Sequence, residues 1–316
     1  MNKIVFYKKR TFGDKFNVIF EFIKQNWRPI FRYVSYGVLP LSLLGGLSLS
    51  VLLGNVIQMG YGSGSDVELM LPFFVSYLGV IAIASLAGWW ASTVMFTLMQ
   101  VYNERKGGLE GVMFSDLKPL LKRNAWRIFK LAVVMTLLVV VYVSLAVALA
   151  FVHWSLCTLL VVALLVLLVP LMLVSPVYMY EPVGVWTALV RGIRLGWKTW
   201  GGIFGLGFVM ALMASVAEGI VGLPWQVCYF VQMIFVGDYS AVFVHSVWFT
   251  LISYVTSCVM IYVQFLCSCL FFVTISYLYS HAAEKIEGMS IEEGIDHFDE
   301  MADRNEDPEI ADFDKL

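Results

Sequence analysis

The sequence predicts an all-α polytopic membrane protein with six transmembrane helices in three hairpins, each preceded by an amphipathic cytoplasmic interfacial helix. Of the 316 residues, 60% are hydrophobic and only 14% are charged, whereas about a quarter of an ordinary soluble domain is charged. The apolar residues form six blocks, each long enough for the roughly 20-residue helix that crosses a bilayer. Basic residues occur only in alternate connections between these blocks, which is typical of a chain that crosses a membrane repeatedly.

The six apolar blocks are the predicted spans, and they cover residues 33–57, 71–102, 129–151, 154–180, 201–223 and 242–279. The third is rich in Leu, Val, Ile and Phe, each of which favours insertion by about 0.3–0.6 kcal/mol at the bilayer centre. The sixth is long for one crossing, but no Gly or Pro interrupts it. We therefore expect one long helix there, tilted or protruding from the membrane. The shorter outer segment 225–235 is expected to lie along the outer surface.

The basic residues predict the orientation of the chain. All 21 Lys and Arg lie before the first span, between spans two and three, between spans four and five, or after the sixth, with Lys130 at the edge of the third span. By the positive-inside rule, both termini are expected in the cytoplasm of a bacterial cell, with the spans in its inner membrane. The chain then divides into a six-span domain, residues 1–280, and an acidic cytoplasmic tail, residues 281–316.

A stretch with apolar residues at helical spacing precedes each predicted hairpin. In residues 12–31 the aromatic and Ile positions form one face, and Lys15 belongs to the opposite, polar face. Residues 186–198 show the same division, with Arg191, Arg194 and Lys198 on the polar stripe. Residues 115–127 are less regular. Such helices lie in the interface with the basic face toward anionic headgroups.

Similar short sequences end these stretches. Trp27-Arg28 precedes the first span, Trp126-Arg127 the third, and Trp200 the fifth. These similarities favour an internal repeat of three modules, each with an interfacial helix and two spans. The alternative is that Trp and Tyr gather at membrane interfaces without any duplication.

The region around the fourth span resembles a known family. The signature starts at Ser175-Pro176 and continues through Glu181, Gly184, Ala188, Arg191, Leu195, Gly196, Trp197 and Trp200. The exit from the last span, Tyr277-Leu278-Tyr279 followed by Glu284 to Gly288, fits the same pattern. The chain is similar in these motifs to bacterial six-span proteins of the glycerophosphoryl diester phosphodiesterase membrane-domain family. The family name implies an activity only where a catalytic barrel is fused, and no segment here is long or polar enough to form one, so the resemblance implies architecture alone.

The cytoplasmic half of the fourth span is the first candidate site. Pro170 and Pro176 predict a kink, because proline removes a backbone hydrogen bond, and Pro182 is expected at the start of the next helix. A kinked end beside Arg191 and Arg194 would hold an anionic group such as a lipid phosphate. The alternative is a purely structural bend. The candidate residues for binding lipid or a partner are Glu181, Arg191, Arg194, Lys198, Trp126 and Arg127.

Glu218 is the second candidate, for transport. It is the one acid well inside a predicted span, and an intramembrane carboxylate favours a functional role. Counted from Gly201, it lies about 26 Å along the fifth span, near the outer boundary. A wetted position at the membrane rim is the alternative.

The motifs of an enzyme, a metal site and a nucleic-acid surface are missing from the sequence. Gly62-Ser63-Gly64 with His153 and His245 shows no spacing that favours a catalytic triad. The four His residues are scattered, and the five Cys residues are expected to be apolar packing residues, so we predict no metal and no cofactor. The 13 acids from His281 onward would repel nucleic acid. Apolar spacing persists in residues 284–301, which form a candidate docking segment for a membrane or cytoplasmic protein. The alternative is that this segment docks on the chain's own basic loops.

Two functions remain open at this point. The first is a non-enzymatic protein that organises the membrane or supports a partner through anionic phospholipid headgroups. The second is a small-solute or ion transporter or channel that uses Glu218 and the kinked fourth span.

Overall fold

A computed structural model describes residues 3–61, 66–105, 107–235, 243–244 and 246–288. Within these ranges the chain forms helices and no strand, so the predicted all-α fold is confirmed. Six stretches are long and apolar enough to cross a membrane. The helices are α1 (Phe12–Tyr61), α2 (Asp66–Glu104), α3 (Phe114–Val152), α4 (Trp154–Leu171), α5 (Val174–Tyr180), α6 (Val185–Lys198), α7 (Trp200–Phe235) and α8 (Val247–Ile286).

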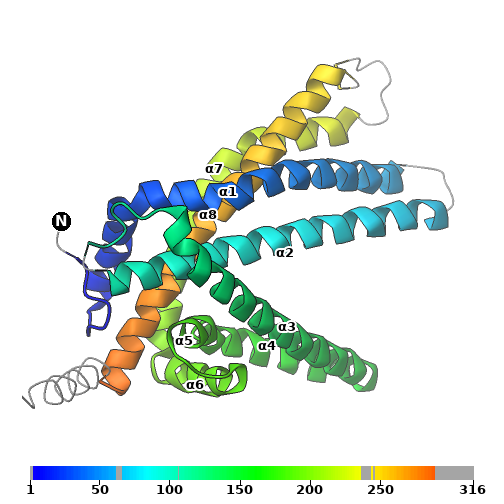
Figure 1. Ribbon diagram of the computed structural model, residues 1–316. Coiled ribbons are helices and arrows are strands. Elements are labelled where there is room, and N and C mark those ends of the chain that lie inside the picture. Colours follow the sequence, from blue (N-terminus) through cyan, green and yellow to red (C-terminus); the bar gives the residue numbers. More distant parts are fainter. Residues whose placement is uncertain (1–2, 62–65, 106, 236–242, 245, 289–316) are drawn as a thin grey trace, which may run out of the picture.

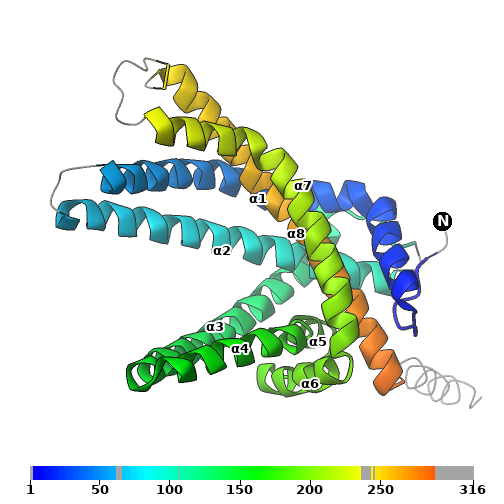
Figure 2. The same ribbon diagram turned by 180° about the vertical axis from the view of Figure 1, so that it is seen from behind.

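The long helices pair as three hairpins, α1 with α2, α3 with α4, and α7 with α8. Figures 1 and 2 show that these hairpins meet at one end of the molecule and diverge toward the other. The core lies at the shared end, where the fully buried side chains include Phe22 of α1, Phe96 of α2 and Tyr277 of α8. Away from it, α3 and α4 expose apolar residues such as Val141 and Leu159. A helix that is apolar all round needs lipid or protein around it.

The stretches before the hairpins take three different forms. Asn26 has non-helical backbone angles, φ −118° and ψ 17°, and α1 bends there. Residues 115–127 are continuous with the third span in α3, which differs from the expected separate helix, because Asn124 and Ile128 are buried and Asn124 bonds to Thr97 of α2. Only α6 is a separate helix, and it ends at Lys198 with Thr199 as its C-cap.

The fourth span breaks where the prolines predict. Helix α4 ends at Leu171, directly after Pro170, and α5 begins at Val174. Because proline lacks the backbone N–H and crowds the preceding turn, the helix ends near it. The expectation for Pro182 was wrong, since α6 begins at Val185 after the N-cap residue Gly184.

The last hairpin also extends beyond the predicted spans. The sixth span is one helix from Val247, as expected. The segment from Trp225 to Phe235, which we expected along the outer surface, is helical and continues α7 past Pro224. Cys228 of this extension packs in a small buried cluster with Val244 and Phe249. Contact with the start of α8 therefore holds the extension in place.

Candidate functional site

Glu181 lies at the centre of an ion-pair network at the shared end. It follows α5 directly, and only 6% of it is exposed. The Tyr279 hydroxyl donates a 2.6 Å hydrogen bond to its Oε1, and the Arg191 Nη1 lies 2.8 Å from its Oε2. Both oxygens of this buried carboxylate therefore face a partner, as a buried charge requires.

The network continues to the end of α8. Glu287 Oε2 lies 2.5 Å from Arg191 Nη2, and its Oε1 lies 3.6 Å from Arg194 Nη2. The sequence predicted that Arg191 and Arg194 bind an external anion, whereas the structure pairs them with carboxylates of the same chain. Sequence reasoning missed Glu287 because it lies nearly 100 residues away, although the Glu284 to Gly288 motif contained it.

Burial and pairing act on these charges in opposite directions. Burial raises the pKa of the Glu181 carboxyl above its ordinary value of 4.5, while the Tyr279 hydrogen bond and Arg191 lower it by less. Burial lowers the pKa of Arg191, but Glu181 and Glu287 together raise it above its ordinary value. Arg191 thus stays a cation, and the network holds α5, α6 and α8 together.

Glu181→Gln is expected to fold, and its stability relative to that of the wild type is expected to increase as the pH rises. Because the pKa of Glu181 is raised in the folded state, its protonation stabilises the folded wild type fully below pH 4.5. The wild type loses this stabilisation as the pH rises through the raised pKa. Gln keeps an acceptor for Tyr279 and cannot ionise. Thermal unfolding in detergent between about pH 4 and pH 8 measures the difference in melting temperature between the two proteins. A wild type that becomes more stable relative to the variant as the pH rises would contradict this account.

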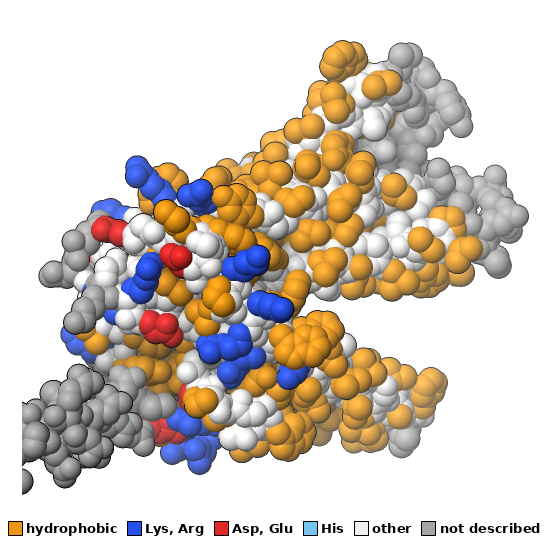
Figure 3. Space-filling model, in the orientation of Figure 1, with side chains coloured by type: hydrophobic (Ala, Val, Ile, Leu, Met, Phe, Trp, Pro, Cys, Tyr) orange, Lys and Arg blue, Asp and Glu red, His pale blue; other side chains and the backbone are white. Residues whose placement is uncertain are grey.

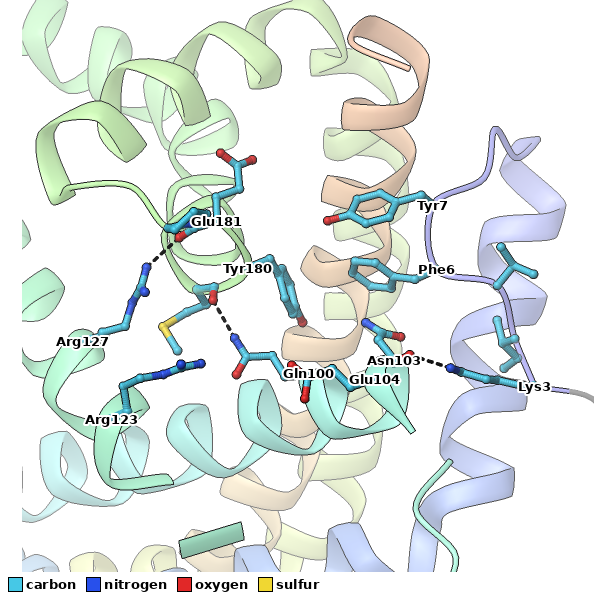
Figure 4. A pocket seen from close by; sticks show the side chains of 14 residues that line it. Lys3, Phe6, Tyr7, Gln100, Asn103, Glu104, Arg123, Arg127, Tyr180 and Glu181 are labelled. Carbon is cyan, nitrogen blue, oxygen red and sulfur yellow. Dashed lines mark hydrogen bonds between the residues drawn. The ribbon is translucent and has the colours of Figure 1, made fainter. Parts of the chain in front are cut away.

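Arg127 lines a cavity of about 650 Å³ beside the ion-pair network. Its Nη2 donates to the carbonyls of Tyr178 and Glu181, the latter at 2.8 Å, which fastens α3 to the end of α5. In Figure 4, Arg123 and Lys3 reach toward the cavity from opposite sides. Lys3 donates to the Asn103 carbonyl. The lining residues include the cations Lys3, Arg123 and Arg127 and the acids Glu104 and Glu181, so the charge of the cavity is mixed.

Trp126 lies outside this cavity, on the surface of α3. Its ring is exposed and stacks on Phe129 with the centroids 5.5 Å apart, and Lys130 lies over it. With Trp89 and Lys122 it lines an apolar groove of about 680 Å³. Aromatic rings beside basic residues are typical of membrane interfaces.

The other two candidates lie apart from the ion-pair network. Lys198, at the end of α6, lines a small basic pocket with Lys15 and Lys285. Glu218 is half-buried on α7, close enough to Cys267 of α8 for an electrostatic interaction. The break after α4 approaches α7 at Gly207, where a Cβ would lie 4.0 Å from Met172 Sδ. Eleven residues of helix, about 16 Å, separate Gly207 from Glu218. The structure therefore does not bring Glu218 and the kink together.

The remaining candidates add no reactive centre to the part of the chain that the structure describes. His153 caps the start of α4. Residues 62–65 and His245, which belong to the weak triad pattern, lie outside the described residues. All five cysteines are free, and no group of three His, Cys, Asp or Glu within the described ranges is placed to hold a metal ion.

The fold and the spans define the class of this protein, which is a multi-pass α-helical membrane protein. No family model, curated protein or solved structure matches the chain. The resemblance to the phosphodiesterase membrane-domain family therefore stays a prediction.

Proposed function

We propose that this protein is a non-enzymatic component of the bacterial inner membrane, with both termini in the cytoplasm. It organises the bilayer, or supports a membrane partner, by contacting anionic phospholipid headgroups. The proposal comprises the predicted three-module repeat, in which α6 and the first segment of α1 lie in the cytoplasmic interface.

The observation that carries the proposal is the separation of the hairpins. Figure 3 shows a deep notch between the α1–α2 and α3–α4 arms, with hydrophobic side chains on both walls and Lys and Arg side chains around its inner end. Trp126, Lys122 and Arg123 of α3 line one groove together with Trp89 of α2. In a membrane, acyl chains fill a space with apolar walls, and basic residues attract the phosphates above them. The notch thus supports a lipid-contacting role.

The tail segment 284–301 is the proposed binding site for a membrane or cytoplasmic protein partner. Its described part ends at Gly288, and Glu287 already binds Arg191 and Arg194. A partner would therefore use the residues that follow, whose apolar positions include Ile291, Ile295 and Phe298.

The proposal is tested by purification in native lipid nanodiscs and mass spectrometry of the retained lipids. The triple variant Lys122→Gln, Arg123→Gln and Lys130→Gln removes cations beside the notch, each worth about 1 kcal/mol toward an anionic surface. We expect the wild type to be enriched in anionic lipid and the variant to lose most of that enrichment. The control Lys8→Gln with Lys9→Gln removes two exposed cations elsewhere. Equal lipid composition in wild type and triple variant would overturn the proposal.

The transporter hypothesis rests on Glu218. Its carboxylate is half-buried on α7 and forms no ion pair with another described residue. Proteoliposome flux assays with Glu218→Gln address it, and a solute flux that this change abolishes would replace the lipid-organising proposal.

A further inference from the structure

Two pockets are each lined by residues of α1, α7 and α8, and we call the line along which these three helices meet the groove. The two pockets differ in polarity. The pocket at the shared end has a volume of about 280 Å³. Its charged and titratable residues are Lys15 from α1, Lys198 from the end of α6, and His281 and Lys285 from α8, and no acid is among its described lining residues. Gly201 and Gly202, from the first turn of α7, complete the wall. The pocket therefore carries an excess of positive charge.

Lys15 is the informative residue of this polar pocket. The sequence placed it on the solvated face of an interfacial helix, but in the structure only 6% of it is exposed. No hydrogen bond or ion pair of its ammonium group occurs among the described residues. A Cβ added at Gly202 would lie 3.7 Å from the Lys15 Nζ, so the ammonium lies against the first turn of α7. Lys15 lines the pocket together with two other lysines, so an anionic ligand there would supply the counter-charge that its ammonium lacks.

The neighbouring groups have the same preference. His281 Nδ1 accepts a 3.1 Å hydrogen bond from the Arg10 backbone N–H, so in the neutral ring Nε2 carries the proton and is a donor. The backbone N–H groups of Gly202 and Ile203 donate to the Thr199 carbonyl, so the first turn of α7 contributes the positive end of its helix dipole. Side-chain donors from α1, α6 and α8 thus surround one small volume, which suits the oxygens of a phosphate.

The second pocket is apolar and has a volume of about 410 Å³. It is lined by α1 at Phe20 and Trp27, by α7 at Met213 and Ala217, and by α8 at Leu270. Along α7, the step from Gly202 to Ala214 is 12 residues, or about 18 Å. A Cβ added at Gly205, between these two positions on α7, would lie 3.6 Å from Phe12 Cε2. An acyl chain has the length to cover this distance.

We propose that the groove between α1, α7 and α8 binds one anionic phospholipid with an exposed phosphate, such as phosphatidic acid. The phosphate occupies the polar pocket on Lys15, Lys198 and Lys285, and one acyl chain follows the groove to the apolar pocket. This site deepens the proposed function and rests on it, because it is a specific headgroup contact within the general lipid role. The apolar pocket is the reason to choose a lipid over a free phosphate.

The test is native mass spectrometry of the full chain in detergent, titrated with dioleoyl phosphatidic acid. Lys15→Gln is expected to weaken lipid binding by about tenfold or more, as loss of a buried charge-assisted contact does. Lys24→Gln, which removes an exposed lysine of the same helix, should change it less than about twofold. The melting temperature of lipid-free Lys15→Gln should equal or exceed that of the wild type, because the change removes one of three lysine charges that line the same pocket. An equal affinity of wild type and Lys15→Gln would overturn the site.

A second arm separates the lipid from a free phosphate. Ala217→Trp fills the apolar pocket and is expected to weaken phosphatidic acid binding while leaving the lysines intact. Inorganic phosphate, used as competitor, should displace the lipid only at concentrations far above that of the lipid. If Ala217→Trp has no effect and phosphate alone binds as tightly, the ligand is water-soluble and the lipid site is wrong. If Lys15→Gln keeps the wild-type affinity while the triple variant of Lys122, Arg123 and Lys130 still loses anionic lipid, the phosphatidic acid site is wrong and the proposed function stands. If neither variant has an effect, both proposals are wrong.

Discussion

Arg191→Ala is expected to lower the free energy of unfolding by about 3 kcal/mol, because it leaves the buried Glu181 without its cation. Arg191 is a quarter exposed and Glu181 is nearly fully buried, so solvent compensates little of the loss. The substitution also frees Glu287 from its shorter ion pair. Thermal or denaturant-induced unfolding of the purified protein in detergent measures the change in the free energy of unfolding.

Arg194→Ala is the matched control for this experiment. Arg194 lies one turn along the same helix, its side chain is 64% exposed, and it pairs with Glu287 at 3.6 Å. An exposed pair of this kind contributes about 0–1 kcal/mol. Comparable losses in the two variants would show that Glu181 is not the element that makes Arg191 important, and would contradict the network described above.

Gly196→Leu is expected to detach α6 from the broken fourth span and to lower the free energy of unfolding by more than about 3 kcal/mol. A Cβ at Gly196 would lie 2.4 Å from the Pro170 Cα and 2.8 Å from its carbonyl oxygen. These are backbone atoms beside a helix end, so the neighbour cannot rotate away. Gly192 is in a similar position, with its Cβ 2.8 Å from the Val174 Cα.

The control for the glycine contact is Gly201→Ala. Gly201 is helical and has no atom within 4 Å of an added Cβ, so Ala there is expected to be neutral or stabilising by up to about 1 kcal/mol. Melting temperatures of both variants in detergent give the comparison. If Gly196→Leu has the same melting temperature as the wild type, the packing of α6 does not depend on the close approach of Gly196 to Pro170.

Apolar length and charge distribution were enough to predict the spans and their pairing. Blocks of more than 20 apolar residues have only one stable use, a helix across the bilayer, and the prolines of the fourth span predicted its break at Pro170. Helix ends were less predictable. The extension of α7 past Pro224 depends on contact between Cys228 and the start of α8, and no local pattern contains that contact.

The candidate site shows the same division more sharply. The sequence by itself determined that basic residues gather in alternate connections and that Glu181 and Arg191 lie close together along the chain. Only the tertiary structure decided that Arg191 binds Glu181 and Glu287, and that Lys15 is buried beside Gly202. A residue's charge and periodicity follow from the sequence, whereas its burial and its partner depend on which distant helix packs against it. The solvated position predicted for the Lys15 side chain was wrong for that reason, because residues of α7 and α8 pack against the face that a lone amphipathic helix would expose.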